Sequence, residues 1–263
     1  MTASVAAGLS GDSGWILTAA TLVVAGLLLV PGWIVGRSAR LAALPSLAVA
    51  PALSSAITAA AEILAHTLAL PWLPWGWAVI AGLTAVLALM ARLIVGARPE
   101  RARRAASQGR AEWVILAAGL TVAVAVPAGV ILSVLPGPGY PAQVFDATFH
   151  LNAVAAIREG GNASMLGGLS ALYSGRAVYY PTVWHGAVAL APGSPAPVST
   201  AGVLALTAVV WPLSLLGLLA RAAGLDAARA SETDRARRRQ RTCAVAAVLA
   251  LSAAVVGFPL LPM

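Results

Sequence analysis

Residues 113–135 read WVILAAGLTVAVAVPAGVILSVL and carry no charged side chain. A helix rises about 1.5 Å per residue, so about 20 apolar residues cross a hydrocarbon core about 30 Å thick. This segment is therefore long enough and apolar enough to cross a lipid bilayer as a helix. It predicts that membrane lipid, and not water, surrounds much of this chain.

The rest of the chain repeats this pattern. Hydrophobic residues make up 60% of the 263 positions and charged residues 10%, and the mean hydropathy is +0.86. These values lie outside the range of ordinary soluble domains. We therefore predict an all-α protein, a polytopic transmembrane helical bundle with about six spans. The predicted spans are Trp15–Val35, Leu41–Leu70, Trp75–Val95, Trp113–Leu135, Thr200–Leu219 and Cys243–Leu261. Tryptophans near their ends, such as Trp72 and Trp75, are typical of the headgroup layer.

The placement of arginine predicts the orientation. All 17 basic residues are arginine, and 15 of them follow the first, third and fifth predicted spans. Because positively charged loops stay in the cytoplasm during insertion, the amino terminus and residues 136–199 are expected outside, in a multi-pass protein of the cell membrane. The same rule accounts for the pI near 11.2. Membrane lipids are therefore the expected partners, and nucleic acid is not.

The predicted spans divide the chain into three parts. Residues 1–135 hold four spans with arginine-rich cytoplasmic loops, residues 136–199 form an extracytoplasmic loop, and residues 200–263 hold two further spans. The last span ends without a hydrophilic tail, so we expect the chain to be the amino-terminal part of a larger protein. A complete six-helix protein is the alternative.

Two short interfacial helices are expected in the loop, which is too polar and too rich in glycine and proline to span a membrane. In the first, from about residue 145 to 159, Asp146 and His150 are four positions apart and share one face. A carboxylate beside an imidazole can take a proton from an attacking hydroxyl. Alternatively, Asp146 only caps the helix and His150 is an ordinary interfacial residue.

The second helix follows a cluster of aromatic residues. Residues 179–185 read YYPTVWH, which brings Tyr179, Tyr180 and His185 close together in the sequence. Such rings are suited to stacking on a sugar or lining a pocket for a lipid headgroup. An interfacial aromatic belt has the same composition, so both interpretations stay open.

Four further charged or titratable residues are candidates for substrate binding. Arg158 and Arg176 are the two arginines on the outer side, and a guanidinium group suits a lipid-linked phosphate or pyrophosphate. Glu62 and His66 lie near the outer end of the second span, where ionisable residues are costly and often functional. The alternatives are solvated loop charges for the arginines and a simple interfacial location for Glu62 and His66.

The sequence gives little indication of a metal site or a cofactor. The only cysteine, Cys243, excludes an internal disulfide and every multi-cysteine metal site, and it is interpreted as a small apolar helix residue. No metal ligands and no cofactor are predicted. A requirement for a divalent metal ion stays open.

The loop resembles a known enzyme family. Residues 145–150 read FDATFH, residues 157–160 read IREG and residues 180–185 read YPTVWH. Their order and spacing, over about residues 140–220, resemble the first large periplasmic loop of GT-C-type polyprenyl-phosphate-dependent glycosyltransferases. The chain looks especially like an actinobacterial group of multi-pass membrane proteins with this loop pattern. The resemblance implies that Asp146 is the general base, and that His150, Tyr180 and His185 shape the pocket.

These observations lead to one leading functional hypothesis and two alternatives. The resemblance implies the amino-terminal part of an inverting glycosyltransferase that moves a sugar from a polyprenyl-phosphate donor to a cell-envelope acceptor. A transporter or lipid-translocating subunit is one alternative, but it needs polar residues deep in several spans, and only Glu62 and His66 are of this kind. The other is a non-catalytic scaffold whose loop binds a partner. The sequence does not decide whether the protein is an enzyme.

Overall fold

The computed structural model describes residues 3–96, 110–134, 137, 140, 145–225 and 232–257, and over these residues it is built from helices. The all-α fold class is therefore confirmed. The long helices are α1 (Ala3–Ser38), α2 (Ala43–Thr67), α3 (Trp72–Val95), α4 (Arg110–Val134) and α9 (Glu232–Gly257). The shorter elements are α5 (Phe145–Gly160), η1 (Ser170–Tyr173), α6 (Val183–Ala189), α7 (Pro195–Leu204), η2 (Ala205–Val210) and α8 (Trp211–Ala222).

Five helical segments are long and apolar enough to cross a membrane. They are Gly14–Ser38, Ala43–Thr67, Trp72–Val95, Ala111–Val134 and Pro195–Ala222. Each matches one of the first five predicted spans, and the fifth runs through α7, the π-helical turn η2 and α8 without a break. For the sixth predicted span, Cys243–Leu261, the structure describes α9 as far as Gly257, and residues 258–263 lie outside the described residues. The chain is therefore a multi-pass membrane protein, with five candidate spans in its described part.

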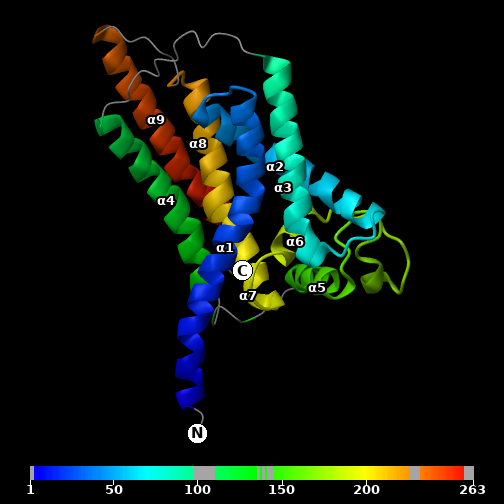
Figure 1. Ribbon diagram of the computed structural model, residues 1–263. Coiled ribbons are helices and arrows are strands. Elements are labelled where there is room, and N and C mark those ends of the chain that lie inside the picture. The colour runs from blue at the N-terminus through cyan, green and yellow to red at the C-terminus, as the bar shows by residue number, and fades with distance from the viewer. Residues whose placement is uncertain are drawn as a thin grey trace.

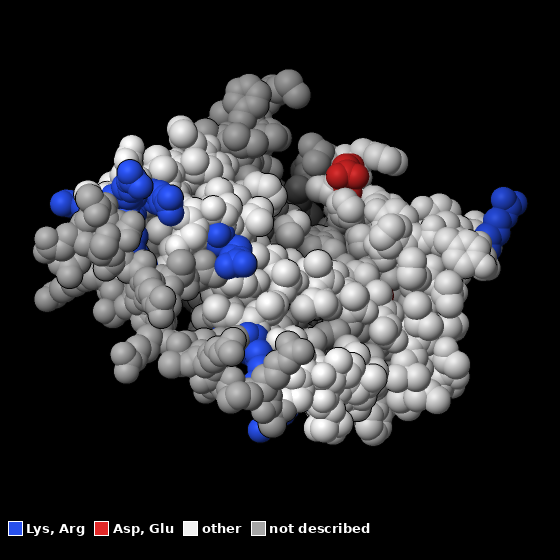
Figure 2. Space-filling model, turned by 90° about the horizontal axis from the view of Figure 1, so that it is seen from above, with Lys and Arg blue, Asp and Glu red and all other residues white. Residues whose placement is uncertain are grey.

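The long helices run back and forth between two ends of the bundle (Figure 1). At one end lie α5, α6, η1 and the starts of α3 and α7; at the other lie the last turns of α1, α3 and α8 and the start of α9. Arg37, Arg92 and Arg221 occupy those last turns. Figure 2 looks onto this second end and shows basic side chains spread over it. The folded loop and these arginines therefore lie at opposite ends, while the orientation of the bundle in the cell stays a prediction.

Helices α1 and α2 pack closely because glycine lies at their contact. A Cβ atom on Gly32 would collide with the backbone carbonyl oxygen of Ala50. The N–H of Gly32 donates to Oγ of Ser54 at 2.8 Å, so this buried polar atom has a partner. Small residues that let two backbones approach are typical of helix packing in membranes, where dispersion contacts replace the hydrophobic effect.

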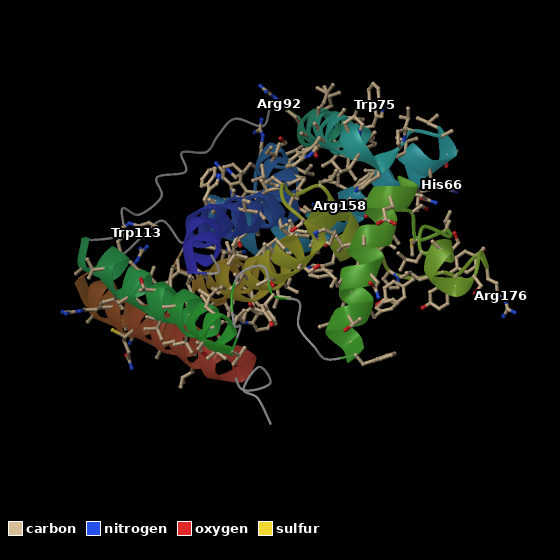
Figure 3. The ribbon with its side chains drawn as sticks, turned by 90° about the horizontal axis from the view of Figure 1, so that it is seen from below. His66, Trp75, Arg92, Trp113, Arg158 and Arg176 are labelled. Carbon is tan, nitrogen blue, oxygen red and sulfur yellow. The ribbon has the colours of Figure 1, made fainter. Side chains whose placement is uncertain are left out.

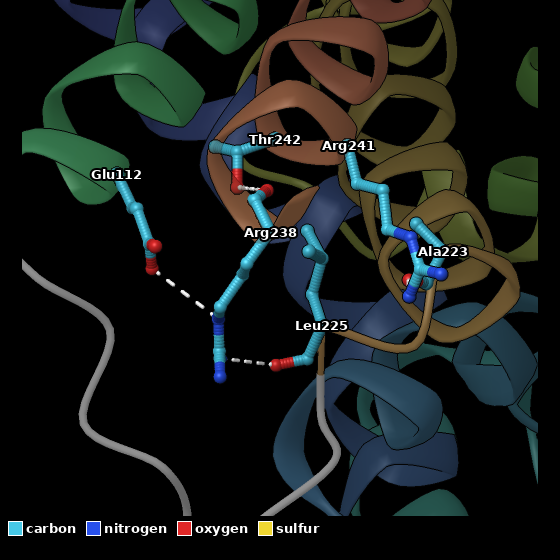
Figure 4. A network of polar contacts seen from close by, with 6 residues as sticks. All are labelled: Glu112, Ala223, Leu225, Arg238, Arg241 and Thr242. Carbon is cyan, nitrogen blue, oxygen red and sulfur yellow. Dashed lines mark hydrogen bonds and ion pairs between the residues drawn. The ribbon is translucent and has the colours of Figure 1, made fainter. Parts of the chain in front are cut away.

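A polar network joins α4, α9 and the end of α8 at the arginine-bearing end (Figure 4). Nε of Arg238 lies 3.4 Å from Oε2 of Glu112, and its Nη2 donates to the carbonyl oxygen of Leu225 at 2.6 Å. Arg241 donates to the carbonyl oxygen of Ala223 at 3.3 Å. These contacts satisfy carbonyl groups that the end of α8 leaves without helical partners. The α4–α9 pair is therefore fixed to the rest of the bundle by charged groups as well as by apolar packing.

Candidate functional site

The candidate site is formed where α5 lies against α6. The expected first loop helix, residues 145–159, matches α5, and its buried face carries Ala153, Val154 and Ile157. These three side chains belong to the main apolar core of the bundle. Burial of this face, and not the intrinsic helix propensity, holds a helix of this length in place. The opposite face is free to present polar groups.

Three titratable side chains lie in a line across the two helices. Oδ2 of Asp146 is 3.4 Å from Nε2 of His150, and Nδ1 of His150 is 2.8 Å from Nε2 of His185. Exposure falls along this line: the side chain of Asp146 is 87% exposed, that of His150 is 31% exposed, and His185 is buried. The line therefore leads from the surface of the folded loop into the protein interior.

The charge on Asp146 decides which nitrogens carry protons. An ionised carboxylate attracts an N–H and repels the lone pair of a nitrogen, so it favours the form of His150 with its proton on Nε2. In the neutral form of His150, Nδ1 is then an acceptor, and the hydrogen between the two rings is donated by Nε2 of His185. Nδ1 of His185 is buried without a hydrogen-bond partner, which suits a nitrogen without a proton. Each donor in this arrangement points toward Asp146.

Aromatic rings surround the two imidazoles. The rings of His150 and His185 are stacked, with centroids 5.0 Å apart and planes 28° apart. Trp184 packs edge to face on both histidines, at 5.6 Å from His150 and 5.0 Å from His185. Phe149 and Tyr180 close the cluster from the other side, with centroids 5.2 Å apart. The rings shield His185 from water and restrict the orientation of both imidazoles.

Burial changes the protonation of His185. Desolvation, and next the repulsion from a positive charge on His150, lowers the pKa of His185 from 6.5 to about 4. The backbone carbonyl of Pro181 partly opposes this shift. At neutral pH His185 is therefore an uncharged imidazole, and it can form a hydrogen bond with His150.

Glu62 and His66, which the sequence places four positions apart near the end of the second span, have different surroundings. Glu62 is 1% exposed, and its Oε2 accepts a hydrogen bond from Oγ1 of Thr182 at 3.0 Å. His66 is exposed at the end of α2 (Figure 3). Glu62 therefore faces the segment that leads into α6, whereas His66 faces outward.

Arg158 and Arg176 also differ. The guanidinium of Arg158 donates to three backbone carbonyls at the end of α6 and just beyond it: Nε to Ala189 at 3.0 Å, Nη2 to Ala191 and Nη1 to Gly193. Partial burial lowers the pKa of Arg158. Arg176 is exposed and lies at the outer edge of the folded loop, away from Arg158 (Figure 3). Arg158 thus ties α5 to the backbone after α6, while Arg176 is accessible to a ligand.

The two tyrosines of the aromatic cluster point to different surroundings. Tyr179 is 79% exposed, and its backbone pairs with that of Leu166. Tyr180 belongs to the ring cluster, at 5.7 Å from His185. Only Tyr180 therefore contacts the histidine pair, and Tyr179 lies on the surface of the loop. Among the described residues, no group of three or more His, Cys, Asp or Glu side chains is arranged to hold a metal ion.

One protein family matches about nine-tenths of the chain. A model of the family DUF6541, described as a family of unknown function, matches residues 25–263. The chain belongs to this family. The match includes all of α2, α5 and α6, and so it covers the whole candidate site of this DUF6541 member. No match was found among curated proteins or among solved structures.

Sequence reasoning missed the role of two residues of this DUF6541 chain that support the site. Thr182 bonds to Glu62, and Trp72 donates from Nε1 to the carbonyl oxygen of Gly186 at 2.9 Å. Trp72 is buried at 1% exposure, so its ring packs inside the protein and not against lipid. In the sequence, the one indication that another element packs closely here was Gly186, which directly follows His185 near the start of an apolar helix.

Proposed function

We propose that this chain is part of a membrane glycosyltransferase activity that moves a sugar from a polyprenyl phosphate to a cell-envelope acceptor. The observation that carries the proposal is the line from Asp146 through His150 to His185 at one end of the bundle. Asp146 is the general base, His150 orients it, and His185 holds His150.

The exposed carboxylate suits proton abstraction from a large acceptor. The acceptor oxygen attacks the anomeric carbon, and the bond from that carbon to the phosphate oxygen breaks with its electron pair going to the phosphate. The acceptor proton passes to Asp146, so attack from the face opposite the phosphate inverts the anomeric centre. Because Nε2 of His150 lies 3.4 Å from Oδ2 of Asp146, one carboxylate oxygen is held and the other is left for the acceptor.

The location of the site supports a lipid-carried substrate. Helix α5 lies at the end of the bundle where α2 ends and α3 begins, so a sugar on a membrane lipid would be presented close to Asp146 (Figure 1). The ring cluster around His150 offers apolar surface next to the carboxylate, and exposed Tyr179 offers a further ring. Aromatic surfaces of this kind stack on sugar rings.

The donor phosphate requires a cation. Of the two arginines in the folded loop, Arg158 already uses its three nitrogens on backbone carbonyls. Arg176 is exposed and is therefore the better candidate for direct contact with the phosphate. In this proposal Arg158 acts on the phosphate only through the segment that it positions.

The proposal is tested by substituting the base in the full-length protein. Membrane vesicles containing Asp146→Asn are offered polyprenyl phosphates that carry radiolabelled sugars, and transfer to envelope acceptors is measured. We expect transfer to fall by about 10²- to 10⁴-fold, because a general base contributes on this order. The matched control is Glu159→Gln, an exposed carboxylate on the same helix, which should keep the wild-type rate. Equal transfer by the two variants would refute the assignment.

Burial of Glu62 in a candidate span favours one alternative function, a lipid-translocating subunit. This alternative predicts the opposite pattern of variants. Movement of a fluorescent lipid across proteoliposomes would be lost in Glu62→Gln and kept in Asp146→Asn. A non-catalytic scaffold predicts that neither substitution changes transfer or lipid movement.

A further inference from the structure

Helix α6 is too short to be stable by itself. It has seven residues, Val183–Ala189, whereas isolated helices shorter than about 12 residues are marginal in water. The helix nevertheless carries His185, whose ring must be placed within hydrogen-bond distance of His150. Contacts outside α6 must therefore fix its first turn.

One polar contact to the start of α6 comes from the membrane-spanning helix α2. Oγ1 of Thr182, the residue that caps α6, donates to Oε2 of Glu62 at 3.0 Å. Thr182 is fully buried and Glu62 is 1% exposed, so water does not compete for this hydrogen bond. A hydrogen bond to a buried carboxyl group is costly to break, because both groups lose their partner.

A second contact fixes the other side of the same turn. Gly186 donates its N–H to the carbonyl oxygen of Thr182 at 2.8 Å, which closes the turn around His185. A Cβ atom on Gly186 would collide with Oε1 of Glu62, so the backbone here rests directly on the carboxyl group. Nε1 of Trp72 donates a hydrogen bond to the carbonyl oxygen of Gly186. Thr182 and Gly186, which are four positions apart on the same face of the turn, therefore both contact Glu62.

We propose that Glu62 is a positioning residue that fixes the first turn of α6 on α2 and thereby holds the His185 imidazole against His150. Its importance for catalysis rests on the proposed glycosyltransferase function, but the placement of His185 does not. An apolar residue of the same size would pack equally well and would avoid burying Oε1, which has no hydrogen-bond partner. Such a residue would, however, leave the Thr182 hydroxyl without the acceptor that Glu62 provides.

Histidine NMR tests this proposal without any assay of transfer. The chain contains three histidines, so the full-length protein labelled with ¹⁵N-histidine in detergent micelles gives one set of imidazole signals each for His66, His150 and His185. The signals are assigned with three single variants, each with one histidine changed to glutamine. The midpoint of His185 is then followed with pH. The titratable groups near this ring are His150 on α5, Asp146 beyond it, Glu62 on α2 and Tyr180.

Four variants separate positioning from a direct effect of charge. Thr182→Val and Glu62→Ala break the bond between the two helices, and each should move the His185 midpoint by about one pH unit or more toward its ordinary value. Thr182→Ser keeps a hydroxyl, and Glu62→Gln keeps an acceptor oxygen, so both should leave the midpoint in place. The exposed His66 should not change in any variant.

Two results would overturn the proposal. One is an unchanged His185 signal in Thr182→Val, and the other is a shift in Glu62→Gln as large as that in Glu62→Ala, which would mean that the charge acts directly. If Glu62→Ala does not fold, the comparison of Thr182→Val with Thr182→Ser still decides. Failure of Asp146→Asn to affect transfer would refute the proposed function and leave this inference standing.

Discussion

Nδ1 of His150 lies 2.8 Å from Nε2 of His185, although 35 positions separate the two residues in the chain. The contact joins α5 to α6 and places a buried, uncharged imidazole behind an exposed carboxylate. It also means that a change in either helix is transmitted to the orientation of the Asp146 side chain.

Stability should fall on acidification because of His185. Its pKa in the folded protein is about 4, below the 6.5 of the unfolded chain, so below about pH 6.5 the unfolded state binds the proton and the folded state does not. The folded state therefore loses stability as the pH falls from about 6.5 to about 4, by up to roughly 3 kcal/mol. Thermal unfolding in detergent, measured over this range, should show a smaller loss in His185→Gln than in the wild type. His66→Gln is the control, and equal slopes in all three proteins would contradict the prediction.

Replacing Arg158 should destabilise the protein, whereas replacing Arg176 should not. Arg158→Ala leaves three backbone carbonyls without their donor, which costs about 2–4 kcal/mol. Arg176→Ala removes an exposed side chain and should change stability by less than about 0.5 kcal/mol. Denaturant unfolding in micelles measures both values. A stable Arg158→Ala protein with reduced donor binding would instead assign this arginine to the phosphate.

Two glycines on α4 should respond differently to alanine. A Cβ atom on Gly119 would lie 2.6 Å from the carbonyl oxygen of Ala246 on α9, whereas one on Gly129 would meet no atom within 4 Å. Gly119→Ala should therefore separate the two helices and cost about 1–3 kcal/mol. Gly129→Ala should be neutral or stabilising by up to about 1 kcal/mol, because alanine favours the helix. The free energy of unfolding in micelles distinguishes them, and equal effects would show that α4 and α9 do not pack this closely.

The orientation in the membrane can be tested with single cysteines. In a Cys243→Ala background, Ala171→Cys places a thiol on the exposed surface of η1, and Leu41→Cys places one at the opposite end of the bundle. The arginine distribution predicts that a membrane-impermeant maleimide labels position 171 in intact cells, and position 41 only after permeabilisation. The reverse pattern would put Asp146 in the cytoplasm and would remove the case for chemistry on the outer surface.

Features that repeat along the chain could be predicted from the sequence. The five candidate spans follow from hydropathy alone, since lipid tolerates only segments with internally satisfied backbones. The pairing of Asp146 with His150 follows from their four-residue spacing on one helix, a local rule that needs no tertiary structure. Such features depend on the composition and period of short segments.

Features that depend on long-range packing could not be predicted. Glu62 and Thr182 are 120 positions apart, and no local pattern indicates that they meet. The burial of Trp72 depends on α6 packing over it, so its place at a span end could be predicted but its hydrogen bond to Gly186 could not. Arg158 looked like a ligand for phosphate because the carbonyls that it binds become neighbours only after the chain turns back.

Helix α6 and the segment after it are held largely by side chains that donate hydrogen bonds to main-chain oxygens. Trp72 bonds to the oxygen of Gly186, and Arg158 bonds to those of Ala189, Ala191 and Gly193. A main-chain oxygen is present whichever amino acid occupies the position. The attachment therefore depends on the path of the main chain, and a substitution at Ala189 or Ala191 that still fits the buried core would leave it intact.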